Sequence, residues 1–528
     1  SVRPPRRGLS RAAAIRHNGA VKHAQLARTL AVVAVALCTP SGAGAQDAAA
    51  SAWRDLTLAD VEAAYGIVAR NHPAATVAAG DSAFRRTLEA ARTAAQGRAR
   101  EVRSYEGWLA TLRAFAVAFD DPHIALQTRL SLGSVRWPGF VVARLGEATV
   151  VASRDTTDAT PPAPGAILVS CDGVPADQYG RTRLGVFRGT WDVASQRVRT
   201  TPFLLVDDGN PFLPPARQCV VLERGVERTI ELRWRSATVS ALQDRLRDAS
   251  PVGSAGFEVR RAGDGWWIGI QSLGGRVQSV LDSVAARVTE IRAAPWVVVD
   301  VRGNGGGNSE WANRLAIQLV GQERTNAAMR LAERQFASGM CGTSWRASAD
   351  VEQTIEGYIR DMGPRLGEAS INQWRRELDS VRVARQEGRE LAPAPRNCAP
   401  TAQQNAATVL PAALMKGKLV LLTDHACFSS CLMLAGLFRA VGALHVGEGT
   451  DFSTRYMEVR GFPLPSGLAS FATLQKAGFG MPMRLGPFEP EIPYPGRIDE
   501  TRAIEAWIMS LVRERRAPDV GQWQFQSR

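Results

Sequence analysis

The chain has 528 residues, more than a single domain usually holds, and 45% of them are hydrophobic, which is enough for packed cores. Its formal net charge is +13, but seven cations and no acid lie in residues 1–45, so the remainder carries about +6. The arginines are scattered and form no basic stripe with interleaved aromatic residues. This pattern argues against a nucleic-acid partner.

The first 45 residues have the composition of an export signal. A basic front precedes the apolar run Leu30–Cys38, which is too short to span a bilayer. Small residues at Ala43 and Ala45 then precede Gln46, as at a cleavage site. The pattern predicts a secretory signal peptide over residues 1–45 and a periplasmic or extracellular protein. No later segment of the sequence is long and apolar enough to suggest a membrane span.

Six cysteines follow this segment, and an even number in an oxidising compartment favours disulfides. Many pairings are possible; the preferred set joins cysteines within local modules, namely Cys171–Cys219, Cys341–Cys398 and Cys427–Cys431. The last bridge would clamp the turn that contains Ser429, although two small buried thiols are the alternative. The cysteine spacing is not that of a metal site, and we expect neither a metal nor a cofactor.

Residues 46–130 are predicted to form an N-terminal helical region. Apolar residues recur at helical spacing in several segments as far as Phe119. Pro122 then breaks the helix, and the residues from Ile124 onward alternate like a strand. His123 is therefore expected at a helix-to-strand junction.

Residues 131–240 are predicted to form a β-rich module, because strand-like segments alternate with turns. The stretch from Pro164 to Pro175 is a strand that ends in an Asp-Gly turn, and it closely resembles a characteristic stretch of PDZ domains. PDZ domains can capture peptide C-termini along a sheet edge. The alternative is a PDZ-like module that only packs against the rest of the chain.

Residues 255–325 and 405–515 are predicted to form an α/β domain. A buried strand over 295–302 runs into a loop of four glycines, and a helix follows from Glu310 to Val320. These glycines would let backbone N–H groups approach a substrate closely, or they serve the turn geometry alone. Residues 326–404, which lack strand signals, are predicted to form a helical insertion that caps the site, and 516–528 a polar tail.

Ser429 lies between a second predicted buried strand, Leu419–Leu422, and a predicted helix, which Gly442 is expected to end. Backbone N–H groups are unpaired at a helix N-terminus, and the helix dipole favours negative charge there. This location suits a hydroxyl that acts as a nucleophile and then carries an oxyanion. The alternative is that Ser429 only caps the helix.

Four segments together resemble the tail-specific (C-terminal-processing) peptidase superfamily of serine peptidases, which includes tricorn. They are Asp121-Pro-His123, Asp300-Val-Arg-Gly-Asn-Gly-Gly-Gly307, Cys427-Phe-Ser-Ser-Cys431 and Gly447-Glu-Gly-Thr450, in the order of the family. The resemblance implies an α/β fold with a crotonase-like (ClpP-like) catalytic domain beside the helical region and the PDZ-like module. It also implies a polypeptide substrate; the sequence leaves the oligomeric state open.

The resemblance further implies the catalytic residues. One branch of the family uses a Ser/Lys dyad, but no Lys occurs at Asp451–Arg455, where that branch would place it. The other branch uses Ser, His and Glu, which makes Ser429 the nucleophile, His123 the general base and Glu489 the orienting acid, with Glu491 as its rival.

The oxyanion hole is expected to use backbone N–H groups of Gly305 or Gly306 and of Ser430. His425 is a rival base, but its turn is expected to point it elsewhere. Leu432 stands where the family often has Glu, which leaves open a second class of function, a non-catalytic ligand-binding or scaffold relative.

Overall fold

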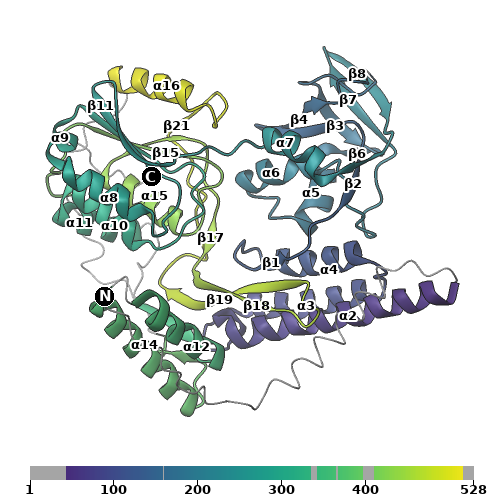
Figure 1. Ribbon diagram of the computed structural model, residues 1–528, viewed down its shortest axis with the longest axis horizontal. Coiled ribbons are helices and arrows are strands. Elements are labelled where there is room, and N and C mark those ends of the chain that lie inside the picture. Colours follow the sequence, from purple (N-terminus) through teal and green to yellow (C-terminus); the bar gives the residue numbers. More distant parts are fainter. Residues whose placement is uncertain (1–42, 159, 335–341, 364–366, 396–409, 515–528) are drawn as a thin grey trace, which may run out of the picture.

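The computed structural model describes residues 43–158, 160–334, 342–363, 367–395 and 410–514 (Figure 1). In this view the α/β body, the β-rich module and the helical region lie around a long β-hairpin near the lower centre. None of the helices in these ranges is both long and apolar enough to cross a bilayer.

The α/β body is built on a six-stranded sheet in the order β10-β11-β12-β15-β16-β21. Its strands are β10 (Phe257–Ala262), β11 (Gly265–Ile270), β12 (Trp296–Asp300), β15 (Lys418–Thr423), β16 (Leu444–Gly447) and β21 (Ile492–Pro493). From β11 onward neighbouring strands are parallel, and only β10 is antiparallel to its neighbour. Parallel strands end at the same edge, so the loops after β12 and β15 lie side by side.

Both faces of this sheet are covered by helices, which explains why its central strands are apolar throughout. Val297 and Val299 face one hydrophobic core and Val298 the other, because side chains alternate along a strand. The larger core contains α8 (Val277–Ala286), α9 (Val288–Ala293), α10 (Glu310–Val320), α11 (Gln322–Arg334) and α15 (Ser430–Val441). The amphipathic helix α16 (Thr501–Arg513) covers the opposite face.

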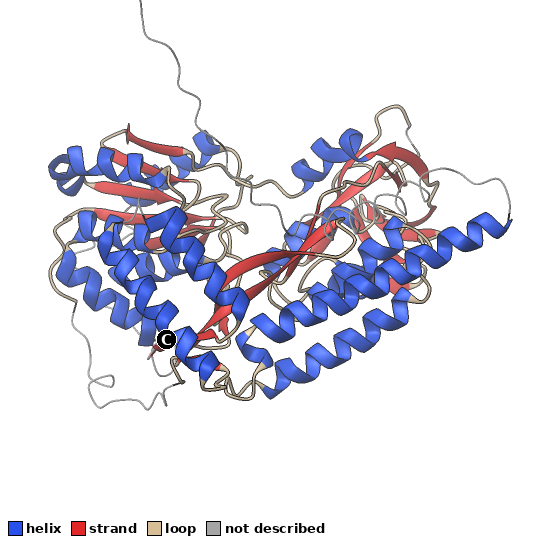
Figure 2. Cartoon of the chain, turned by 60° about the horizontal axis from the view of Figure 1, so that its bottom comes forward, coloured by secondary structure: helices blue, strands red, loops and turns tan. Residues whose placement is uncertain are grey.

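The helical region and a late β-hairpin share one core. Helices α2 (Ala43–Asn71), α3 (Ser82–Ala99) and α4 (Tyr105–Val117) pack on the long hairpin of β18 (Tyr456–Pro463) and β19 (Ala469–Phe479), which crosses the centre of Figure 2. A one-turn helix, η1 (Pro73–Ala75), joins α2 to α3. Strand β1 (Ala125–Thr128) pairs with β19 directly after His123. This pairing fixes His123 beside the α/β body.

The predicted insertion contains helices, but the expectation that it lacks strands is wrong. Strands β13 (Gly342–Arg346) and β14 (Leu391–Ala392) extend the hairpin sheet beyond β19. Between them lie α12 (Ala349–Gly357), a π-helical turn η3 (Tyr358–Met362) and α14 (Glu368–Gln386). These helices have their own small core around Trp345 and Leu378.

The β-rich module contains a sheet in the order β3-β4-β5-β7-β8, with β6 beside β5. Its strands are β3 (Phe140–Leu145), β4 (Ala148–Arg154), β5 (Ile167–Cys171), β6 (Val174–Pro175), β7 (Gln218–Glu223) and β8 (Val226–Glu231). Helices α5 (Ala176–Phe187), α6 (Ala194–Thr200), η2 (Thr201–Phe203) and α7 (Val239–Ala249) surround it, and β2 (Ser134–Trp137) pairs with β9 (Arg235–Thr238).

Two of the three predicted disulfides are present. Cys171–Cys219 joins β5 to β7 inside the module, and Cys427–Cys431 spans the turn that contains Ser429. Cys341 and Cys398, the third predicted pair, lie outside the described residues.

Candidate active site

Ser429 occupies a sharp turn between β15 and α15. Its backbone angles, φ 58° and ψ −126°, lie in a region that a residue with a side chain rarely adopts. Such a strained strand-to-helix turn holds a serine hydroxyl clear of the backbone, as in nucleophile elbows. Ser429 does precede the first residue of α15, but its side chain makes no capping hydrogen bond. The capping role is therefore not what its hydroxyl performs.

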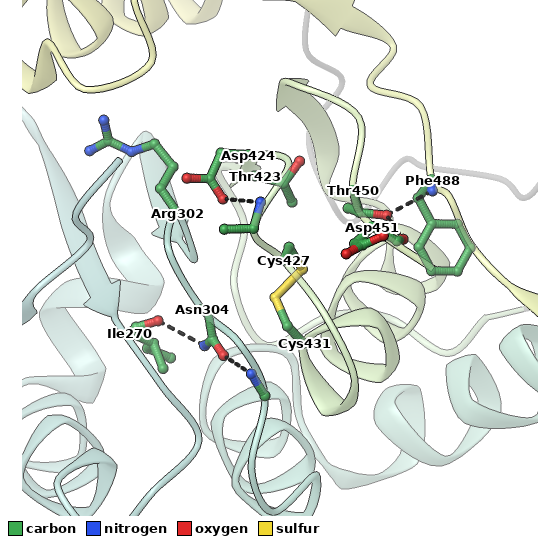
Figure 3. Close-up of a disulfide and its surroundings, with 12 residues drawn as sticks. Ile270, Arg302, Asn304, Thr423, Asp424, Cys427, Cys431, Thr450, Asp451 and Phe488 are labelled. Atoms are coloured by element: carbon green, nitrogen blue, oxygen red, sulfur yellow. Dashed lines mark hydrogen bonds between the residues drawn. A yellow bond between two sulfur atoms is a disulfide. The ribbon is translucent and has the colours of Figure 1, made fainter. Parts of the chain in front are cut away.

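Buried contacts stabilise this turn. The disulfide Cys427–Cys431 bridges its two sides, and both cysteines are fully buried (Figure 3). The Asp424 carboxylate accepts hydrogen bonds from the N–H groups of Gly253, Gly303 and Ala426. Because two of these donors come from other segments, Asp424 ties the turn to its neighbours.

The glycine loop after β12 packs directly against Ser429. Asn304 is fully buried; its amide donates to the Ile270 carbonyl at 2.8 Å and its oxygen accepts from Gly306 N–H at 2.8 Å (Figure 3). Gly306 has φ 99°, and a methyl group there would come within 2.8 Å of Ser429 Cβ. Both the backbone conformation and the close approach therefore require glycine.

His123 and Ser429 meet as predicted, although 306 positions separate them in the sequence. His123 Nε2 lies 3.0 Å from Ser429 Oγ, and the imidazole packs against the Phe428 ring at 4.3 Å between centroids. The other ring nitrogen, Nδ1, lies 3.0 Å from Asp121 Oδ1. With the proton on Nδ1, the imidazole donates to Asp121 and accepts from the Ser429 hydroxyl.

Asp121 is a buried carboxylate with several donors. Its Oδ1 also accepts the His123 backbone N–H at 2.9 Å, and its Oδ2 accepts the Thr454 hydroxyl from β17 (Ser453–Thr454). Burial alone would raise the pKa of Asp121, but the hydrogen bonds from His123 and Thr454 outweigh it and lower the pKa below its ordinary value. Asp121 is therefore ionised at neutral pH.

The predicted acid, Glu489, is not the carboxylate that contacts His123. Glu489 is exposed and its carboxylate lies over Gly449, while both nitrogens of His123 are engaged by Ser429 and Asp121. Its rival Glu491 is also exposed and contacts the backbone of His445 on β16. The carboxylate that contacts His123 is therefore Asp121, two residues before the histidine, and not the predicted Glu489.

The predicted oxyanion donors need a similar correction. The Gly306 N–H already donates to Asn304, so it is not free for a substrate oxygen. Gly305 is exposed and does not line the cleft beside Ser429, whereas Gly307 and Ser430 do. The Ser430 hydroxyl donates to the Gly307 carbonyl at 2.7 Å, which holds these two segments together.

His425 points away from Ser429, as expected from its turn. Its Nδ1 lies 2.7 Å from Glu448 Oε2 and its Nε2 lies 3.3 Å from Ser250 Oγ. Burial lowers the pKa of His425, but the adjacent Glu448 carboxylate more than offsets this, so the pKa is raised overall. His425 therefore tethers the linker after α7 to the turn.

A cleft of about 810 Å³ opens over Ser429 and His123. One wall comes from α10, α15 and the segment around Leu273, and the other from β18 and the turn after β19. Tyr358 and Trp374 of the insertion line it as well. Within the described ranges, no group of three or more His, Cys, Asp or Glu side chains is placed to hold a metal ion.

A half-buried serine hydroxyl lies 3.0 Å from a histidine that also contacts a buried carboxylate, at a strand-to-helix turn of an α/β fold. This arrangement is typical of serine hydrolases. The model of peptidase family S41 matches residues 267–477, which include the glycine loop and Ser429. This part of the chain belongs to peptidase family S41, and the protein is a serine-type peptidase. The resemblance drawn from the four sequence segments is confirmed.

Two solved structures share the overall fold. Mature CPAF has a TM-score of 0.53 and 12% identity, with 87% of this chain and 98% of CPAF covered. Mature CPAF complexed with lactacystin has a TM-score of 0.50 and 14% identity, with coverage of 87% and 99%. A search of the curated proteins returned no match.

Proposed function

We propose that this protein is an exported serine endopeptidase in which Ser429 is the nucleophile, His123 the general base and Asp121 the acid that orients His123. The single observation that carries the proposal is the 3.0 Å separation of His123 Nε2 from Ser429 Oγ at the strained turn. Separations of this size permit direct proton transfer from the hydroxyl to the imidazole.

The reaction follows from this geometry. Ser429 Oγ attacks the scissile carbonyl carbon while its proton moves to His123 Nε2, and the carbonyl oxygen becomes an oxyanion. His123 then donates this proton to the leaving amine, the C–N bond breaks, and an acyl-enzyme remains. Water attacks the ester with His123 again as base, and the carboxyl product leaves. Ionised Asp121 stabilises the imidazolium that forms in each half of the reaction.

The oxyanion hole in this proposal consists of the N–H groups of Ser430 and Gly307. Ser430 is the first residue of α15, where the N–H groups have no intrahelical acceptor and the dipole favours negative charge. Gly307 lines the same cleft and is held beside Ser430 by the 2.7 Å hydrogen bond between them. Losing one such donor typically lowers the rate by about 10²–10³.

Three further features belong to the proposal. The α/β body is crotonase-like, residues 1–45 direct export, and the β-rich module is PDZ-like and captures or positions polypeptide. Supporting contacts join the module to the active-site side of the body. Gln196 Nε2 donates to the buried Asp451 carboxylate at 2.7 Å, and Arg199 lies 3.1 Å from it. Asp451 lies three residues before Thr454, which contacts Asp121.

Digestion of an unfolded protein tests this function. The mature chain, starting at Gln46, is incubated with reduced, carboxymethylated protein, and the fragments are identified by mass spectrometry. We expect internal cleavages by the wild type, none by Ser429→Ala, and retained cleavage by Ser279→Ala, which removes an exposed serine that does not line the cleft. A folded wild type that cuts nothing would instead support the non-catalytic, ligand-binding alternative.

A further inference from the structure

A large apolar side chain is exposed one helical turn beyond Ser429. Met433 lies in the first turn of α15, four residues after Ser429, and both residues line the same cleft. Met433 is 42% exposed and lines the cleft. Helical side chains lean toward the N-terminus, which directs the Met433 thioether toward the nucleophile.

Two more methionines lie on the opposite wall. Met457 comes from β18 and Met481 from the turn after β19. A methyl group on Gly478 would lie 2.6 Å from Met481 Sδ and 3.3 Å from Met457 Cε, so both side chains meet over this glycine. Because Gly478 has no side chain, the two methionines have space to pack along the cleft.

Charged groups are almost absent from the described lining of the cleft. Apart from His123, the lining includes only Glu458 and Arg460. Glu458 accepts a hydrogen bond from the Tyr358 hydroxyl at 2.5 Å, and the Arg460 guanidinium stacks on the Tyr358 ring at 4.4 Å. Both charges are therefore already partnered by the insertion.

We propose that Met433 determines the specificity of this site, and that the substrates are extended polypeptides with a bulky apolar residue, such as Leu, Met or Phe, next to the scissile bond. The inference rests on the proposed function and names its substrate class. An exposed apolar surface beside a nucleophile gains free energy by burying an apolar substrate side chain. A Lys or Glu side chain at the same place would lose water without gaining a partner.

The methionine side chains also predict that the site accepts apolar substrate residues of several shapes. Its unbranched, polarisable side chain adapts to ligands of different shape, as it does at promiscuous binding surfaces. Three methionines from two walls would fit leucine and phenylalanine alike. The cleft thus favours segments that are buried in folded proteins and exposed in unfolded ones.

A peptide series tests the role of Met433. Fluorogenic peptides differ at one residue beside the scissile bond (Leu, Phe, Ala, Lys or Glu), and kcat/KM is measured for each. For the wild type we expect Leu and Phe to exceed Lys and Glu by at least about 100-fold. Met433→Ala should lower kcat/KM about 10-fold for Leu and Phe but less than about 3-fold for Ala, and Met433→Glu should favour the Lys peptide.

Met483→Ala is the matched control, because Met483 is 47% exposed but does not line the cleft. The proposal would be overturned if the relative kcat/KM values for the five peptides were unchanged in Met433→Ala and Met433→Glu, or changed equally in Met483→Ala. The same peptides are also titrated into Ser429→Ala, with and without Met433→Ala. Selective binding of Leu and Phe peptides that requires Met433 supports the specificity even if the wild type cleaves nothing, and unselective binding contradicts it.

Discussion

Asp121, rather than an acid near the C-terminus, contacts the histidine of this site. Replacing it with Asn keeps the size of the side chain but favours the wrong tautomer of His123. We expect Asp121→Asn to lower kcat about 10³-fold with a small change in KM, because the carboxylate acts only after substrate has bound. Steady-state kinetics on a peptide substrate check this.

Glu489→Gln and Glu491→Gln are the controls, since both glutamates are exposed and neither contacts His123. Each should keep kcat within about twofold of the wild type. A loss of activity confined to Glu489→Gln, with Asp121→Asn active, would restore the acid that the sequence analysis favoured.

For individual residues, the sequence predicts the pair that meets in the structure but not its surroundings. A helix start and a helix-to-strand junction indicate the positions of Ser429 and His123, and the family resemblance pairs them. Asp121 has a local signal too, because an Asp side chain often binds the backbone N–H two residues on, as it does here with His123. Whether the Gly306 N–H is free to bind a substrate oxygen depends on the orientation of the Asn304 side chain, which accepts its hydrogen bond. No sequence pattern predicts that orientation.

Among the elements, the turn between β15 and α15 depends most on covalent support. The Cys427–Cys431 bridge flanks Ser429, whose positive φ needs surrounding contacts to persist. We expect the double variant Cys427→Ala/Cys431→Ala to lose about 10²-fold in kcat, since small displacements of a reacting group are costly. Activity is measured well below the melting temperature, with folding followed by circular dichroism.

The double variant Cys171→Ala/Cys219→Ala is the matched control, because that bridge lies inside the module. It should lower the melting temperature while kcat stays within about threefold. Equal losses of kcat in both double variants would mean that the bridge at Ser429 has no special role in the turn.

Elements with their own periodicity are predictable here, and elements that depend on a distant partner are not. Glu310–Val320 is a helix with the predicted ends, and Gly442 ends α15 in a left-handed conformation. Strands β13 and β14 escape prediction because both are short. In addition, β13 pairs with β19, more than a hundred residues later in the chain, as well as with β14. Their sequences have no alternation long enough to indicate a strand.

On the scale of the whole molecule, the site exists because the helices before His123 share a core with a hairpin that follows Ser429 in the chain. Helices α2 to α4 pack on the β18–β19 hairpin, and β1 pairs with β19 beside His123 (Figure 1). The hairpin leads back to Thr454, which contacts Asp121. His123 is thus held beside Ser429 because helices α2 to α4, which precede it in the chain, pack on the β18–β19 hairpin, which follows Ser429.

The most direct test of this account is covalent labelling with a fluorophosphonate probe, followed by peptide mapping and labelling kinetics. We expect a single modified residue, Ser429, no labelling of Ser429→Ala, and labelling of His123→Ala slowed at least about 10²-fold. Modification of a different serine, or labelling of His123→Ala at the wild-type rate, would contradict it.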